Sequence, residues 1–113
     1  MTDTTALRDL LAKVEAGWPT DIDTAYMPPI YAVFGVGFQS PCAWQANNGD
    51  LNDAACLAKL TLPGWHWTMD SAGACIYNPG VEGDSVVFSH EGEPARALLI
   101  CILRAMIWEA ERA

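Results

Sequence analysis

A run of seven apolar residues near the end of the sequence constrains the fold more than any other feature. It reads Ala97-Leu98-Leu99-Ile100-Cys101-Ile102-Leu103, and it belongs to a helix that we expect from about Glu93 to Glu111. Pro94 falls in the first turn, where proline is tolerated. A helix that is apolar all round is buried on more than one side. The run is too short to span a membrane, so it predicts a central core helix, an oligomer contact, or both.

The other elements follow from periodicity, caps and turn residues. Apolar residues at helical spacing predict a first helix over residues 4–16. Asp50 is a natural N-cap for a second helix that ends near Leu60. Alternating apolar and polar residues predict a hairpin and then a third short strand. The expected strands cover residues 65–70, 74–77 and 85–89.

Residues 18–47 contain four prolines, which break any long helix. Between them, residues 31–38 combine aromatic and β-branched side chains with two glycines. We expect a strand or a well-packed extended loop there. The whole order predicts one α+β domain over residues 1–113, with a small antiparallel sheet sandwiched between helices.

The composition bears on self-association. In this chain of 113 residues, 51 % are hydrophobic and 18 % are charged, an apolar excess for a soluble domain. A domain of this size has room for one modest core. The surplus suggests an exposed apolar patch, and such patches often mark self-association or ligand binding. We therefore expect a homo-oligomer.

The net charge is -8, from fourteen acidic and six basic residues. Direct binding of DNA or RNA is disfavoured, because a nucleic-acid backbone needs clustered Lys and Arg. The acidity serves solubility, or it forms a surface that meets a basic partner.

The cysteines and histidines indicate neither a metal site nor a catalytic centre. The four cysteines and two histidines are dispersed, whereas zinc ligands recur at close spacing. The first residues are an amphipathic charged segment rather than a signal peptide, so we expect a cytoplasmic protein with reduced thiols. The sequence has no nucleophile elbow, no Walker A motif and no complete dinucleotide loop. We expect no catalytic residue, no metal and no cofactor.

Binding residues are easier to nominate. Trp65, Trp67 and Tyr77 belong to one predicted hairpin, and aromatic rings with an exposed face stack on nucleobases. Trp65 and Trp67 share a strand face, which either forms a stacking platform or packs on the last helix. Arg96 lies in the first turn of that helix, where free N–H groups favour a phosphate. The alternative is that Arg96 forms an ion pair with Glu91 or Glu93. Pairing of subunits could bring two copies of Arg96 or Arg104 together in a basic pocket.

Three segments carry a resemblance to a known family. They are Leu10-Leu11-Ala12-Lys13-Val14-Glu15-Ala16-Gly17, Asp50-Leu51-Asn52-Asp53-Ala54-Ala55 running into Leu62-Pro63-Gly64-Trp65-His66-Trp67, and Pro94-Ala95-Arg96-Ala97-Leu98-Leu99-Ile100 with Leu103-Arg104-Ala105. Together they resemble the phage ABA sandwich domain family of small phage and prophage proteins. The resemblance implies a sheet between helical layers, and it implies no activity or functional residue. Residues 18–47 depart most from it.

These observations lead to a functional hypothesis. We expect a non-enzymatic phage accessory protein that sequesters a small nucleotide-type immune signal of the bacterial host and so counters host defence. The alternatives are an acidic interaction protein that blocks a basic surface of a host nuclease or DNA-binding enzyme, and a structural phage component.

Overall fold

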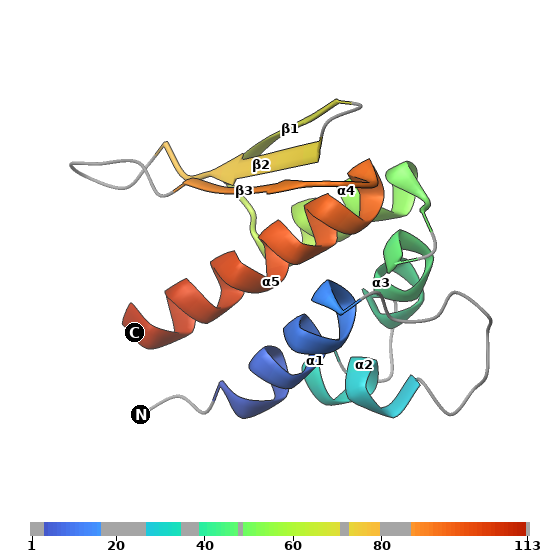
Figure 1. Cartoon of the computed structure of the whole chain (residues 1–113). Coiled ribbons are helices and arrows are strands. Elements are labelled where there is room, and N and C mark those ends of the chain that lie inside the picture. The colour runs from blue at the N-terminus through green and yellow to red at the C-terminus, as the bar shows by residue number, and fades with distance from the viewer. Residues whose placement is uncertain are drawn as a thin grey trace.

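The computed structural model of the chain describes residues 4–16, 27–34, 39–47, 49–70, 73–79 and 87–112 (Figure 1). Within these residues the chain forms five helices and one three-stranded sheet. The helices are α1 (Thr5–Glu15), α2 (Met27–Phe34), α3 (Gln39–Asn47), α4 (Leu51–Thr61) and α5 (Pro94–Arg112), and the strands are β1 (His66–Asp70), β2 (Gly73–Tyr77) and β3 (Val87–Glu91). The expected α+β class is confirmed.

Helix α1 forms where periodicity predicted it, without a side-chain N-cap, and α4 forms behind its predicted cap. In α1 the buried residues Leu10 and Val14 lie four positions apart, on one face of the helix. In α4 the side chain of Asp50 accepts a hydrogen bond of 3.0 Å from the backbone N–H of Asp53. This bond satisfies a donor that has no partner within the helix. Local sequence signals are therefore sufficient for both helices.

The expected strand at residues 31–38 is wrong for its first half, because residues 31–34 belong to α2. Residues 35–38 lie outside the described part of the chain. The reason is the position of the prolines. Pro28 and Pro29 fall in the first turn of α2, and Pro41 falls in the first turn of α3. The first-turn N–H groups make no intrahelical bond, so proline starts these helices instead of excluding them.

The sheet has the order β1-β2-β3, with both neighbouring pairs antiparallel. In the hairpin, Trp67 lies opposite Ile76, and Ile76 lies opposite Phe88. The Asp70 carboxylate accepts a bond of 3.1 Å from the N–H of Gly73, at the start of the return strand. The predicted hairpin is confirmed. The third strand is displaced toward Glu91, and residues 85 and 86 lie outside the described part of the chain.

Helix α5 is the middle layer of the molecule. The sheet packs on one side of it, and α1, α3 and α4 pack on its remaining surface (Figure 1). Each residue from Ala97 to Leu103 is at most 2 % exposed, which confirms the expected core helix. Among the described residues no helix covers the outer face of the sheet, so α5 rather than the sheet occupies the centre of the layers.

Most of the large hydrophobic side chains in the described residues are buried or partly buried in this core. Among the described residues the large hydrophobic side chains that are exposed are Leu51 at 44 % and Leu60 at 45 %. They stand nine positions apart on α4, which is about half a turn around the helix axis. The two leucines therefore form no common patch, and the expected exposed apolar patch is not found in the described residues. No helix in the described ranges has the length and apolarity needed to cross a membrane.

Candidate functional site

The predicted aromatic platform is not assembled. Trp65 is only 5 % exposed and precedes β1. Its ring meets that of Trp108 edge-on, with centroids 5.9 Å apart, and its Nε1 donates a bond of 2.9 Å to Glu109. Trp67 is half-buried against the core under the sheet. Tyr77 lies on the opposite face, 5.5 Å from the ring of His66. The alternative stated for this strand face, packing on the last helix, is the correct one.

The position at the start of α5 where we expected a phosphate is occupied by the side chain of Glu93. The Glu93 carboxylate accepts a bond of 3.1 Å from the N–H of Ala95 and one of 2.8 Å from the N–H of Arg96. These are the donors that an external anion would need at a helix N-terminus. The Glu93 carboxylate therefore occupies the anion position. An anion held by the Arg96 side chain would receive no bond from those two N–H groups.

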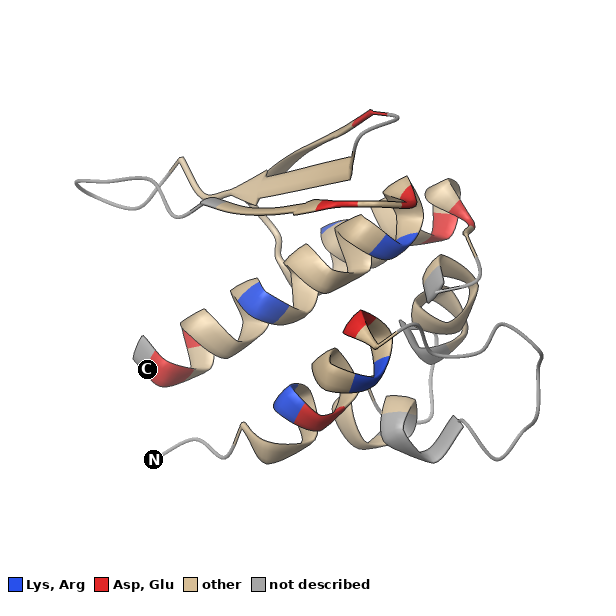
Figure 2. Ribbon diagram, in the orientation of Figure 1, with Lys and Arg blue, Asp and Glu red and all other residues tan. Residues whose placement is uncertain are grey.

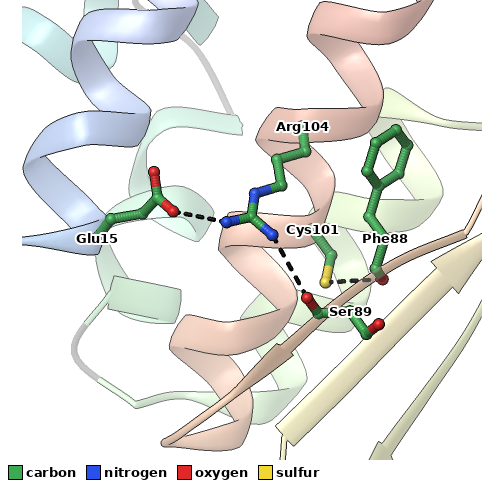
Figure 3. A network of polar contacts seen from close by, with 5 residues as sticks. All are labelled: Glu15, Phe88, Ser89, Cys101 and Arg104. Atoms are coloured by element: carbon green, nitrogen blue, oxygen red, sulfur yellow. Dashed lines mark hydrogen bonds and ion pairs between the residues drawn. The ribbon is translucent and has the colours of Figure 1, made fainter.

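Arg104 links three layers of the fold (Figure 3). Its guanidinium donates a bond of 2.6 Å to the carboxylate of Glu15 on α1 and one of 3.4 Å to the carbonyl of Ser89 on β3. One turn earlier on α5, the Cys101 thiol lies 3.2 Å from the carbonyl oxygen of Phe88. Arg104 thus lies across the exposed side of α5, between helix α1 and the edge strand β3.

A second ion pair repeats this link farther along the two helices. Arg8 on α1 pairs with Glu111 on α5. Arg8 and Glu15 are seven residues apart, and so are Arg104 and Glu111. The two helices therefore run antiparallel and are joined by ion pairs two turns, or about 10 Å, apart. Each helix contributes one arginine and one glutamate.

Two hollows lie along α5 between α1 and β3, and we call them together the groove. The first, which we call the Trp108 hollow, has a volume of about 250 Å³ and is lined by Arg8, Leu11, Phe88, Arg104, Ile107, Trp108 and Glu111. The second, the His90 hollow, has a volume of about 230 Å³ and is lined by Val14, Glu15, His90, Gly92, Glu93, Arg96, Ala97 and Ile100. Arg104 lines one hollow and its partner Glu15 lines the other, so their ion pair marks the boundary.

The two hollows are lined by three arginines and three glutamates, and the glutamates are Glu15, Glu93 and Glu111. Arg8, Arg96 and Arg104 line the hollows, and they are three of the six basic residues of the chain. The charges along α1 and α5 are visible in Figure 2. Guanidinium groups bind carboxylates and phosphates in the same forked geometry. A groove with arginines at its rim and aromatic rings in its wall suits a small anion that carries a planar group.

A larger hollow lies elsewhere, over the outer face of the sheet. It has a volume of about 410 Å³, and its lining includes the carboxylates of Asp70 and Glu91 but neither lysine nor arginine. Thr68, Cys75 and Ser89 form a row across the three strands at this face. His90 also lines this hollow. Two carboxylates with no lysine or arginine beside them repel a phosphate. This hollow is therefore the poorer place for a nucleotide, in spite of its size.

The buried thiols are poorly suited to act as nucleophiles. Burial raises the pKa of Cys101 to about 12, an effect that Arg104 opposes and Cys75 reinforces. Burial also raises the pKa of Cys42 to about 11, with further contributions from Cys56 and Asp53. Both thiols stay protonated at neutral pH, and the thiolate is the reactive form. In the described ranges no three Cys, His, Asp or Glu side chains gather as metal ligands would.

Of the five residues nominated from the sequence, Arg96 and Arg104 line the groove, and Trp65, Trp67 and Tyr77 lie elsewhere. Sequence reasoning missed Arg8 and Phe88. A signal for Arg8 was present, because Arg8, Leu11 and Glu15 fall on one side of a helix at spacings of three and four. The ion pairs themselves join residues too distant in sequence for any local pattern to indicate.

No known protein family matches this chain, and comparison with curated proteins and with solved structures yields no significant match. The function is therefore argued from the site.

Proposed function

We propose that this protein is a non-enzymatic binding protein that holds a small nucleotide-type anion in the groove over α5. The observation that carries the proposal is the gathering of Arg8, Arg96 and Arg104 around two hollows in a chain of net charge -8. Half of the basic residues lie where an anion could be bound, beside the rings of Phe88 and Trp108.

The arginines are held in position before any ligand arrives. Glu15 fixes Arg104, and Glu111 fixes Arg8. A phosphate group can take the place of either carboxylate, because it offers the same pair of acceptor oxygens. The base of a nucleotide would then lie against Trp108 or Phe88, where stacking is tolerant of base identity.

The biological setting of the proposal comes from the resemblance to small phage proteins. In the cytoplasm of an infected bacterium, a protein that binds a nucleotide signal without turning it over removes that signal from the host defence. The proposal includes a homo-oligomer. Two-fold pairing would place a second set of arginines near the first, which is the simplest way for an acidic chain to increase local positive charge.

Thermal unfolding of the purified protein tests binding directly. The panel contains mononucleotides, cyclic nucleotides, cyclic oligonucleotides and NAD-derived signals, and the mass in solution is measured alongside. A ligand at one hundred times its dissociation constant adds about 2.7 kcal/mol of stability, a shift of several degrees for a domain of this size. Arg104→Ala should abolish the shift. Lys59→Ala is the control, because Lys59 is exposed on α4 and lines neither hollow. A shift that survives Arg104→Ala, or no shift with any compound, would contradict the proposal.

The outer face of the sheet supports a second candidate function, the binding of a basic surface on a host nuclease or DNA-binding enzyme. Its described residues include Asp70 and Glu91, both exposed, and strands β1, β2 and β3 contain no lysine or arginine. Complexes driven by charge weaken steeply as salt screens the interaction. If a host protein is captured, strong dependence on ionic strength and loss of binding in Asp70→Asn with Glu91→Gln would favour this candidate. Binding that persists in high salt would count against it.

A further inference from the structure

We infer that the ligand of the groove is a dinucleotide, in which one phosphodiester group joins two nucleosides. Its phosphate would lie at Arg104 and its two bases in the two hollows. This inference rests on the proposed function, since it specifies which nucleotide the groove takes. Three features of the groove lead to it, namely the sizes of the hollows, their spacing and the position of the arginine between them.

The sizes argue for a ligand with two ends. The hollows measure about 250 and 230 Å³. Small-molecule pockets typically span roughly 300–1,000 Å³. Each hollow alone falls below this range, whereas the two together fall within it. A ligand that used only one hollow would leave half of the groove unfilled, so the groove is better matched by a molecule with a group in each.

The spacing sets the length of the connection. Ile107 lines the Trp108 hollow, and Ile100 lines the His90 hollow. Seven residues of helix separate them, which is about 10 Å along the axis. The two planar groups must therefore be held apart rather than stacked on each other. A sugar-phosphate linker in an extended form provides such a separation, and the two hollows then receive one base each.

The arginine at the boundary sets the chemistry of the linker. Arg104 lies between the hollows and contacts Glu15 across 2.6 Å. Any group that connects the two bases must lie beside this guanidinium, and an anionic group there interacts with it favourably. A phosphodiester carries one negative charge, as does the Glu15 carboxylate. It can therefore bind this guanidinium in place of Glu15, whose carboxylate is 36 % exposed and would then be solvated by water.

The walls of both hollows can hold a base. The Trp108 hollow is lined by Phe88 and Trp108. The His90 hollow is lined by His90 and Arg96. Aromatic rings, histidine and arginine planes are the groups on which proteins stack unpaired bases. The carboxylates of Glu93 and Glu111 can accept bonds from exocyclic amino groups of a base.

Isothermal titration with matched probes tests the inference. The probes are the four dinucleoside monophosphates ApA, GpG, CpC and UpU, and the four mononucleotides AMP, GMP, CMP and UMP. Each mononucleotide carries more negative charge than its dinucleotide, so charge alone would favour the mononucleotides. We expect the best dinucleotide to bind at least about tenfold more tightly than its mononucleotide, because stacking of one added base is worth about that factor.

Variants locate the second base. His90→Ala should weaken the dinucleotide by roughly tenfold and leave the mononucleotide unchanged, whereas Trp108→Ala should weaken both. His66→Ala is the matched control, since His66 is exposed on the outer face of the sheet and should change neither affinity. Thermal unfolding of each variant confirms that it is folded.

The outcomes separate the two proposals. Mononucleotides that bind as tightly as dinucleotides, with His90→Ala without effect, would overturn the dinucleotide and leave the binding function intact. If none of the eight probes binds, the dinucleotide inference fails, and the thermal-unfolding panel decides the binding function separately. Preference for a dinucleotide that is lost in His90→Ala supports both.

Discussion

The guanidinium of Arg104 and the carboxylate of Glu15 are 2.6 Å apart in space and 89 positions apart in the sequence. This contact is one of two ion pairs that join α1 to α5, and it marks the boundary between the two hollows. Both side chains are about one third exposed, at 32 % and 36 %. Solvent screens such a pair, so it adds little to the stability of the fold. Its main consequence is the boundary that it sets between the two hollows.

A double-mutant cycle of Arg104→Ala and Glu15→Gln should give a coupling free energy of about 0.5–1 kcal/mol, the range for partly exposed pairs. Arg104→Ala alone should cost more than Glu15→Gln, because Arg104 also bonds to the carbonyl of Ser89. Urea unfolding of the four proteins provides the measurement. Zero coupling would show that the two side chains do not interact in solution.

Leu103→Ala should destabilise the protein by about 2–5 kcal/mol, since Leu103 is fully buried in the middle layer and the substitution leaves a cavity. Leu60→Ala is the matched control. It makes the same chemical change at a side chain that is 45 % exposed, and it should cost well under 1 kcal/mol. Equal losses in the two variants would contradict the placement of α5 at the centre.

Stability should fall as the pH rises from about 9 toward 12, and Cys101 should account for part of the loss. Its thiol has a pKa of about 12 in the folded protein, against 9.0 when it is unburied. Between these values the unfolded chain releases the proton and the folded protein keeps it, so stability is full below pH 9 and declines above it.

Chemical denaturation at intervals between pH 8 and pH 11 measures this decline. Cys101→Ala should make it shallower by the contribution of one proton. Leu103→Ala controls for general destabilisation, because it should lower stability at every pH and leave the slope unchanged. A slope that is the same in Cys101→Ala and the unmodified protein would argue against a protonated, buried thiol.

Gly73→Ala should prevent stable folding or cost several kcal/mol. A Cβ atom at Gly73 would overlap with the carbonyl oxygen of His90 on the neighbouring strand, and Gly73 has a φ of +152°. Gly64→Ala separates the two causes, because Gly64 has a φ of +88° but no heavy atom within 4 Å of the added Cβ. It should cost only about 1–2 kcal/mol, the strain of a left-handed backbone. Circular dichroism and thermal unfolding provide the comparison.

The sequence was informative where the relevant signal is local. The N-cap at Asp50, the alternation through Trp67 and the apolar run from Ala97 each depend on residues within a few positions of one another. They predicted α4, the hairpin and α5. Helices α2 and α3 were missed because a proline breaks a helix in its interior and starts one in its first turn. Residue type alone does not distinguish these positions.

The groove was only partly predictable, because its parts come from distant segments. Arg96 and Arg104 could be nominated as scarce cations in an acidic chain. The cap that Glu93 forms at the start of α5, which blocks the anion position, could be predicted from the sequence. Glu93 and Arg96 are only three positions apart. The pairing of Trp65 with Glu109, by contrast, joins residues 44 positions apart. Whether an aromatic ring faces a ligand or the core depends on such tertiary contacts.

The central place of α5 also affects the order in which the chain can fold. Helix α5 comes after all the other described elements in the sequence, yet the sheet, α1, α3 and α4 all pack on it. During synthesis the earlier helices and the hairpin emerge with their apolar faces uncovered, and they must wait for residues 94–112 before those faces are buried. The contacts of α5 with α1 span most of the chain, and contacts of that kind are slow to form. Newly made protein therefore passes through a period in which it is exposed to chaperones and proteases, and this period ends when α5 covers those faces.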